Sequence, residues 1–214
     1  MDQVFWIVGN VIYLVLLGIA LWGAFCCVVV WRRVAEKRFT SETAQFEFLE
    51  QLDRPLSKGD MKGAAALCDE DARAVPQLAL LAFANHQIGF AKIRQLVEDR
   101  FQRDILADLE HRMTWVHTVI KSAPMVGLFG TVVGMMGAFG KLASGGDSVQ
   151  APQLAEDIML ALITTASGLA IAIPLIIAVA AVNIRIRKME ELTLAGLNRL
   201  LESVHKALLL GRKR

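Results

Sequence analysis

The chain has few of the side chains from which metal centres and disulfide frameworks are built. It contains three cysteines and four histidines among 214 residues. Cys26 and Cys27 lie in an apolar stretch and Cys68 stands alone, so no Cys-x-x-Cys or Cys/His spacing indicates zinc. The odd number of cysteines argues against a set of disulfides, and no two histidines form a ligand pair at helical spacing. We therefore expect no metal site and no cofactor.

The signatures of common enzymes and of nucleic-acid-binding proteins are also missing. The sequence has no nucleophile elbow and no phosphate-binding glycine loop followed by Lys and Ser or Thr. A net charge of +2 is too small to favour nucleic acid, and no stretch interleaves basic with aromatic residues. We expect a protein that is not an enzyme and does not bind nucleic acid.

Charge is absent from three long windows of the chain, at residues 4–31, 122–140 and 158–184. Hydrophobic residues make up 55% of the chain and the mean hydropathy is +0.46, so the chain is more apolar than a soluble domain of this length normally is. A helix rises about 1.5 Å per residue, so each window can cross a hydrocarbon core of about 30 Å. We predict an all-α integral membrane protein with three transmembrane helices, the second and third extended into long cytoplasmic helices.

Basic residues set the predicted orientation of these spans. Arg32 and Arg33 follow the first window, and Arg185, Arg187 and Lys188 follow the third. Because Lys and Arg concentrate on cytoplasmic flanks, we place these ends inside and the short N-terminus outside, with the first span an uncleaved helix rather than a signal peptide. The expected order is an outer N-terminus with the first transmembrane helix (1–31), a cytoplasmic helical insert (32–118), the second transmembrane helix (119–141), an outer periplasmic loop (142–157), the third transmembrane helix (158–184) and a cytoplasmic helical tail (185–214).

The polar insert shows helical rather than strand-like periodicity. The helix-breaking cluster Arg54-Pro55-Leu56-Ser57-Lys58-Gly59-Asp60 predicts a turn, with Asp60 capping the helix that follows. Pro76 marks a second boundary, after which residues 77–90 should be helical. Apolar residues recur every three or four positions over residues 93–120, which predicts one helix that continues into the second span across Pro124.

The second window carries a regular series of glycines. They are spaced by steps of three and four, so on a helix they lie along one side. The third window likewise places small residues on one side, including Gly168, and contains Pro174 in mid-helix. Helices in lipid pack through such faces, so we expect these two spans to pack closely together. The glycines of the second window are Gly127, Gly130, Gly134, Gly137 and Gly140.

Each small-residue face carries a threonine, Thr131 in the second window and Thr165 in the third, with Thr164 beside the latter. Two interpretations stay open. The hydroxyls can bond to carbonyls of their own helices and aid packing, or they can line a narrow, partly wetted path for protons. Neither window contains an acid, the usual mark of a proton relay, so a titratable group would have to come from another chain.

Two motifs on these windows resemble the paired signature of the MotA/TolQ/ExbB proton-channel family and are most similar to those of ExbB and TolQ. They read Gly127-Leu-Phe-Gly-Thr-Val-Val-Gly-Met-Met-Gly-Ala-Phe139 and Ala161-Leu-Ile-Thr-Thr-Ala-Ser-Gly-Leu-Ala-Ile-Ala-Ile-Pro174. The resemblance implies a homopentamer around a central pore that holds the single spanning helices of an ExbD- or TolR-like partner. That partner would bring the missing membrane aspartate, and Thr131 and Thr165 would face the pore.

The resemblance also implies a function. An inner-membrane subunit of this kind would couple the proton motive force to work on the outer membrane, such as TonB-dependent transport. A Tol-type motor for envelope maintenance and a non-conducting membrane scaffold are the alternatives. A TonB- or TolA-like protein and the membrane lipids are further implied partners.

One position departs from the family pattern. ExbB proteins commonly place a glutamate five residues before the threonine of the third window, and that position is Leu160 here. Glu156 and Asp157 lie about one turn toward the outer end. Either they take over a role for an acid at this level, or they only cap the start of a helix, whose dipole favours acids.

Overall fold

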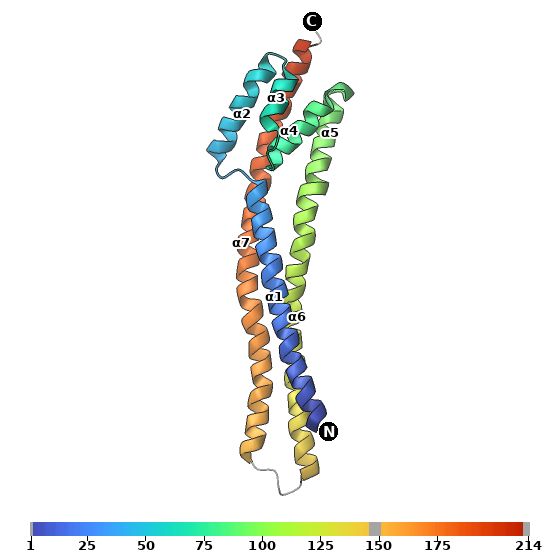
Figure 1. Cartoon of the computed structure of the whole chain (residues 1–214), viewed down its shortest axis with the longest axis vertical. Coiled ribbons are helices and arrows are strands. Elements are labelled where there is room, and N and C mark those ends of the chain that lie inside the picture. Colours follow the sequence, from blue (N-terminus) through green and yellow to red (C-terminus); the bar gives the residue numbers. More distant parts are fainter. Residues whose placement is uncertain (1, 146–150, 212–214) are drawn as a thin grey trace. The chain divides into compact units, whose positions relative to one another are not determined.

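The computed structural model describes residues 2–145 and 151–211, and within these ranges every regular element is a helix (Figure 1). This confirms the predicted all-α class. In chain order the elements are α1 (Asp2–Lys37), α2 (Glu42–Ser57), α3 (Met61–Cys68), α4 (Ala74–Ala84), the 3₁₀-helix η1 (His86–Ile88), α5 (Phe90–Arg100), the π-helix η2 (Phe101–Leu106), α6 (Ala107–Gly145) and α7 (Ala151–Gly211).

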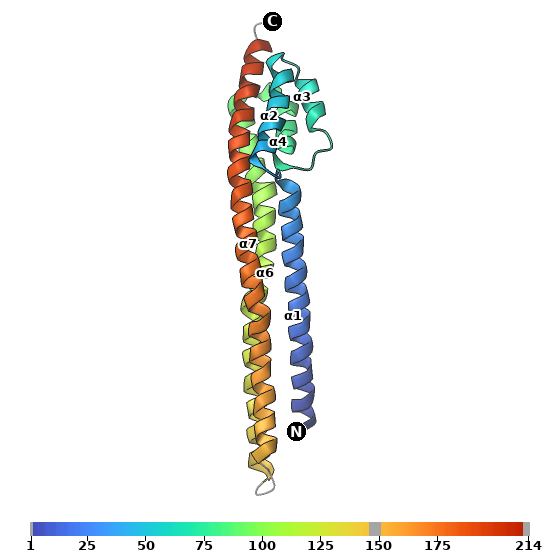
Figure 2. The same ribbon diagram turned by 90° about the vertical axis from the view of Figure 1, so that its left-hand side faces the viewer.

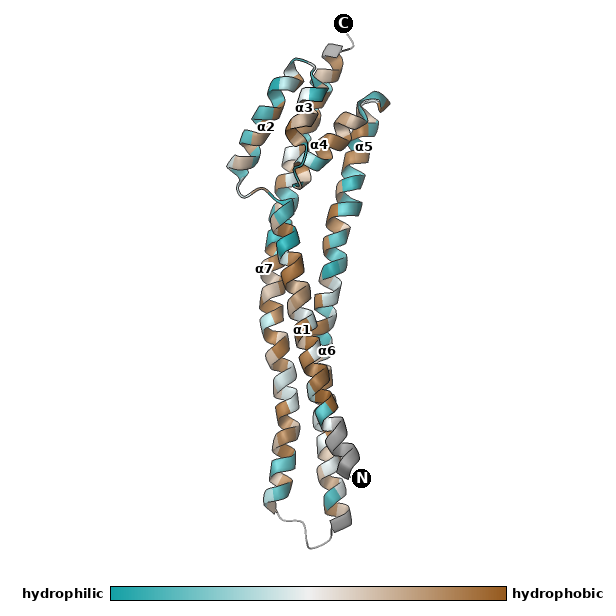
Figure 3. Cartoon of the chain, in the orientation of Figure 1, coloured by the Kyte–Doolittle hydropathy of each residue, from teal (hydrophilic) through white to brown (hydrophobic). Residues whose placement is uncertain are grey.

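Three stretches of the described chain are long and apolar enough to cross a membrane: Gly9–Lys37, Phe90–Ala143 and Ala151–Leu209. Figure 3 shows hydrophobic residues along much of α1, α6 and α7. The prediction of three spanning helices is confirmed. The second and third stretches are 54 and 59 residues long, so they extend well beyond the roughly 20 residues that a bilayer needs.

The chain folds as two compact units. The membrane unit consists of Met1–Val29 and Arg112–Ala181, and the helical domain consists of Val30–His111 and Val182–Arg214. In the membrane unit, large apolar side chains such as Phe129 are exposed, whereas buried positions include small residues such as Ala161. Lipid removes the hydrophobic drive between spanning helices, so this unit depends on close packing of backbones through small residues.

In the helical domain, α2 to α5 pack in sequence on one another and against the last turns of α7 (Figures 1 and 2). The side chain of Gln45 is buried, and its carboxamide donates a hydrogen bond to the Leu192 carbonyl of α7 at 2.6 Å. Asp53 of α2 accepts hydrogen bonds from Arg199 at 3.0 Å and from Ser203 at 2.6 Å. The largest buried side chains of this domain include Leu52, Leu56, Leu78, Ile93, Val97, Phe101 and Leu200.

One helix end in this domain differs from the sequence prediction. A helix was expected over residues 77–90, but α4 ends at Ala84, and Gly89 redirects the chain before α5. Gly89 has a φ of 90°, which favours glycine and which no right-handed helix contains. The expected cap is present, because Asp60 Oδ1 accepts a hydrogen bond from the Gly63 N–H at 2.9 Å where α3 begins.

The long helix expected to enter the second span is confirmed, with one addition. Residues Phe90–Ala143 are helical throughout, across Pro124, but six of them form the π-helix η2. A π-turn holds one more residue than an α-turn, and here Phe101, Ile105 and Leu106 are all buried. Apolar periodicity does not reveal such a turn, because a π-turn shifts the apolar face of the helix by one position and leaves that face continuous.

Parts of the segment 142–157, which the sequence assigned to an outer loop, are helical. Helix α6 runs to Gly145 and α7 begins at Ala151, while 146–150 lie outside the described residues. Pro152 is the second residue of α7 and lies in its first turn. Backbone N–H groups in the first turn of a helix have no acceptor within the helix, so proline, which has no N–H, loses no hydrogen bond there.

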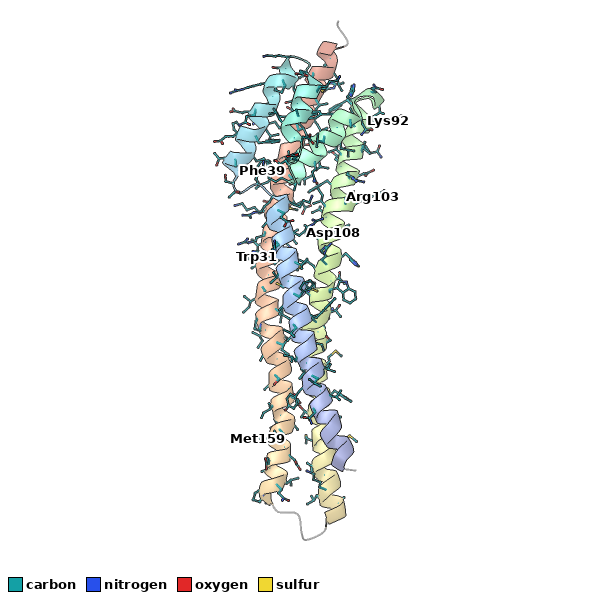
Figure 4. The ribbon with its side chains drawn as sticks, viewed as in Figure 1. Trp31, Phe39, Lys92, Arg103, Asp108 and Met159 are labelled. Carbon is teal, nitrogen blue, oxygen red and sulfur yellow. The ribbon has the colours of Figure 1, made fainter. Side chains whose placement is uncertain are left out.

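Arg73 holds the segment between α1 and α2 onto the start of α4. Its guanidinium lies 3.9 Å from the ring centre of Phe39, a residue labelled in Figure 4, and 5.7 Å from that of Phe48. Its Nε lies 2.9 Å from both carboxylate oxygens of Asp71. The hydrogen bonds from Arg73 lower the pKa of Asp71, because they stabilise the ionised carboxylate.

We predict that Arg73→Lys destabilises the helical domain by about 1–2 kcal/mol, because lysine keeps the charge but loses the ring stacking and the fork-shaped contact with Asp71. Hydrogen exchange of residues 38–48, measured on the full chain, should quicken accordingly. Arg54→Lys, at an exposed position of α2, is the control. Because Arg73 lowers the pKa of Asp71, the ionised Asp71 stabilises the fold above its unfolded pKa, and this stabilisation is lost as the pH falls through the folded pKa. The difference in exchange rate between Arg73→Lys and Arg54→Lys should therefore narrow in acid, and the part that comes from the lost ring stacking should remain. Equal exchange at neutral pH would contradict this role.

Candidate functional site

Helices α6 and α7 approach so closely that three glycines of the second span leave no room for a side chain. A Cβ added at Gly127 would lie 2.6 Å from the Thr164 carbonyl oxygen, and one at Gly130 would lie 2.6 Å from Thr164 Oγ1. At Gly134 it would lie 2.7 Å from Ala161 Cβ. The close approach depends on these positions having no Cβ, as in small-residue packing of membrane helices.

The contact is reciprocal, because α7 also brings a glycine to α6. A Cβ added at Gly168 would lie 2.5 Å from the Ala123 carbonyl oxygen and 3.1 Å from the Pro124 Cα. Gly140 of the second window and Pro174 of the third are not part of this tight contact. Gly140 would place a Cβ with no heavy atom within 4 Å, and Pro174 is exposed on α7.

Three hydroxyls meet in this interface, and we call Thr131, Thr164 and Thr165 the hydroxyl cluster. The Oγ1 atoms of Thr131 and Thr165 are hydrogen-bonded to each other across the two helices. Thr131 Oγ1 also lies 3.0 Å from the Ala161 carbonyl oxygen of α7. Thr164 Oγ1 lies 2.9 Å from the Gly127 carbonyl oxygen of α6 and 2.7 Å from that of Ala161. The cluster therefore joins hydroxyls to backbone carbonyls on both helices.

Burial separates the members of the cluster. Thr164 is only 4% exposed, whereas Thr131 and Thr165 are half-buried. A hydroxyl has one proton to donate and can also accept, so the Thr131–Thr165 pair can pass a proton on but holds no charge at neutral pH. The two windows contain no Asp or Glu, so no carboxylate of these windows accompanies the cluster.

An ion pair joins the two helices where α6 ends and α7 begins. Lys141 Nζ lies 2.8 Å and 3.0 Å from the two carboxylate oxygens of Asp157. Glu156 beside it is exposed. Leu160 is 48% exposed, and its carbonyl accepts a hydrogen bond from the Tyr13 hydroxyl of α1 at 3.2 Å. Sequence analysis proposed the two acids but missed Lys141, although Lys141 and Asp157 directly flank the uncharged windows.

A cavity of about 430 Å³ lies between α1, α6 and α7 in the membrane unit. Gly130, Gly134 and Gly137 line it from α6, and Asp157 and Thr164 line it from α7. Of the hydroxyl cluster, Thr164 alone reaches the cavity, so the Thr131–Thr165 pair lies away from it. Sequence patterns did not reveal this space, because it depends on where α1 crosses the other two helices.

Comparison with known proteins adds independent findings. The MotA/TolQ/ExbB proton channel family matches residues 74–193, a range that includes the glycines, the hydroxyl cluster and the ion pair. The Tol-Pal system protein TolQ of Haemophilus influenzae is 40% identical over 86 residues, 40% of this chain and 37% of that protein. A putative biopolymer transport protein ExbB homolog of Methanothermobacter thermautotrophicus is 27% identical over 168 residues, 77% of this chain and 57% of that protein.

A third relative matches over a larger share of its own length. The putative biopolymer transport protein ExbB-like 2 of Helicobacter pylori is 32% identical over 111 residues, which is 52% of this chain and 71% of that protein. The chain spans less than two thirds of the length of the first two relatives, at 37% and 57%.

Proposed function

The chain belongs to the MotA/TolQ/ExbB proton channel family, and we propose that it couples proton flow to mechanical work together with a partner similar to ExbD or TolR. Family membership and the names of the relatives make it an ExbB/TolQ-type membrane subunit of a transport family rather than an enzyme class. The partner, the coupled work and the roles of individual residues are the proposal.

The observation that carries the proposal is the hydroxyl cluster. A relay needs groups that can both accept and donate a proton, and Thr131 and Thr165 are bonded to each other across two spanning helices. A relay also needs a titratable group, which the two windows lack. A carboxylate on a partner helix beside Thr131 and Thr165 would complete the path.

The proposed mechanism uses the membrane potential, which supplies about 2.3 kcal/mol per proton for every 100 mV. Protons that enter from outside reach the partner carboxylate past the Thr131–Thr165 pair and neutralise it. A neutral carboxyl costs far less to move through a low-dielectric environment than a carboxylate, so the partner helices can then shift relative to the ring of subunits. Release of the proton inward restores the charge and the starting position.

The proposed topology places the N-terminus outside and the insert and tail in the cytoplasm of a cell with an inner membrane. One contact supports it: the ring of Trp31, which ends the first uncharged window and is labelled in Figure 4, lies 3.6 Å from the guanidinium of Arg185, which directly follows the third window. Tryptophan is enriched at both interfaces of a membrane, and the excess of Lys and Arg marks the cytoplasmic one. The homopentamer and its central pore are inferred from the family resemblance.

A non-conducting scaffold is the second candidate, and one observation favours it. Thr131 and Thr164 each have a backbone carbonyl within 3.0 Å, so their hydroxyls are satisfied within the chain and need no water or partner. In that case the cluster only fastens α6 to α7. The two candidates differ in whether removing the hydroxyls stops proton flow.

Reconstitution in liposomes tests the proposal. The chain and an ExbD- or TolR-like protein with one span and one membrane aspartate are inserted together, a potassium-diffusion potential is applied, and internal pH is followed with a dye. We expect acidification above that of vesicles with either protein alone, and a return to that baseline when the partner aspartate becomes asparagine. Flux at baseline with a correctly assembled complex would refute the proposal. Co-purification with a TonB-like or a TolA-like protein would then distinguish transport from envelope maintenance.

A further inference from the structure

The cavity in the membrane unit has the size and lining of a ligand site. Its volume of about 430 Å³ lies within the roughly 300–1,000 Å³ typical of small-molecule pockets, which also form between helices of bundles. Gly9, Asn10 and Tyr13 of α1 form one wall, and glycine backbone of α6 forms another. Apolar surface dominates the lining, and its polar side chains are those of Asn10, Tyr13, Lys141, Asp157 and Thr164.

Nothing in the described part of the chain fills this space. A Cβ added at Gly9 would meet no heavy atom within 4 Å, although Gly9 lines the cavity. An empty apolar space forfeits the dispersion contacts of all the atoms around it. Because the cavity lies among three helices that can span a membrane, hydrocarbon chains of lipids are the apolar groups present at high concentration around it.

The rim indicates which lipid would fit. Lys141 and Asp157 form an ion pair at the lining of the cavity, so a cation and an anion lie side by side there. A headgroup that carries both charges can exchange partners with this pair, with its phosphate on Lys141 and its ammonium on Asp157. An anionic headgroup would meet the Asp157 carboxylate without a compensating cation of its own. The Asn10 carboxamide, also on the lining, can donate to the ester oxygens next to the phosphate.

We propose that this cavity binds one acyl chain of a phospholipid whose zwitterionic phosphoethanolamine headgroup is held by Lys141 and Asp157. A lipid supplies the hydrocarbon and the paired charges in one molecule, which a side chain of a second copy does not. Lipid binding at this cavity requires no proton movement, so a test of the lipid site is independent of a test of the proposed function.

A filling substitution in α1 tests the acyl-chain half of the site. The full chain, purified in mild detergent, is incubated with equal amounts of phosphatidylethanolamine and phosphatidylglycerol of identical chains, and retained lipid is counted by native mass spectrometry. We expect Gly9→Leu to retain about tenfold less phosphatidylethanolamine than the unaltered chain. Gly18→Leu is the matched control, since a Cβ at Gly18 also meets no atom within 4 Å and Gly18 does not line the cavity. Equal retention by the two variants would overturn the proposal.

Charge substitutions test the headgroup half without changing the space. Asp157→Asn should remove the preference for phosphatidylethanolamine over phosphatidylglycerol, and Lys141→Gln should lower retention of both lipids. Glu156→Gln, which changes the neighbouring exposed acid, should leave the preference intact. A photo-crosslinking residue at position 9 should form adducts with lipid. Adducts between two copies of the chain instead would assign the cavity to a subunit interface and overturn the lipid site.

Discussion

Gly127→Val should separate α6 from α7 and destabilise the membrane unit by about 3 kcal/mol or more, at or beyond the upper end of ordinary overpacking. A Cβ at this position would lie 2.6 Å from the Thr164 carbonyl oxygen and 3.0 Å from the Thr165 Cα. Both atoms belong to the backbone, so no side-chain rotation relieves the clash. The helices would have to move apart, which would also break the hydrogen bond between Thr131 and Thr165. Proton flux should therefore fall to baseline together with stability.

Gly140→Val is the matched control on the same helix. It carries the same β-branched side chain and the same change in helix propensity, but a Cβ at Gly140 meets no heavy atom within 4 Å. Thermal unfolding, followed by intrinsic tryptophan fluorescence to which Trp22 and Trp115 of the membrane unit contribute, should show a large drop in midpoint for Gly127→Val and little change for Gly140→Val. Similar midpoints for the two variants would mean that the close approach at Gly127 does not hold the unit together.

Sequence patterns predicted the spanning helices well because a charged side chain is costly to place in the interior of a bilayer. An unbroken window of about 20 uncharged residues has few structural outcomes in lipid. In the helical domain, local signals had to compete with tertiary packing. The break at Gly89 was missed because glycine is compatible with a continuing helix in sequence, and only its φ of 90° shows that the chain turns there.

The sequence drew attention to residues of the α6–α7 interface, but it did not contain their arrangement. Spacing placed the glycines on one side of a helix, yet it could not tell which of them would face another helix. That depends on where α1 and α7 cross α6: Gly127 and Gly134 are in close contact with α7, Gly137 lines the cavity with α1, and a Cβ added at Gly140 would have no heavy atom within 4 Å. In the same way, the pairing of Thr131 with Thr165 depends on the register of two helices, which the sequence of either alone does not contain.

The double substitution Thr131→Val and Thr165→Val should lower proton flux in reconstituted vesicles by about 100-fold, the lower end of what a positioned proton-transfer group contributes. Valine keeps the shape of threonine but neither donates nor accepts, so the bond between the two helices and the path through it are both lost. The fold should survive, because both side chains are only half-buried and the glycine contacts remain. The Trp22 and Trp115 fluorescence transition should move far less than in Gly127→Val.

Two control variants separate conduction from packing. Serine at both positions restores the hydroxyls and should restore most of the flux. Thr118→Val removes a hydroxyl that donates to the Thr114 carbonyl of its own helix at 2.9 Å, outside the cluster, and should leave the flux unchanged. If the double valine variant conducts as well as Thr118→Val, the cluster is a fastening between α6 and α7 and the scaffold interpretation holds. If flux falls with the valines and returns with the serines while the unfolding midpoint stays constant, the hydroxyls act on the proton itself.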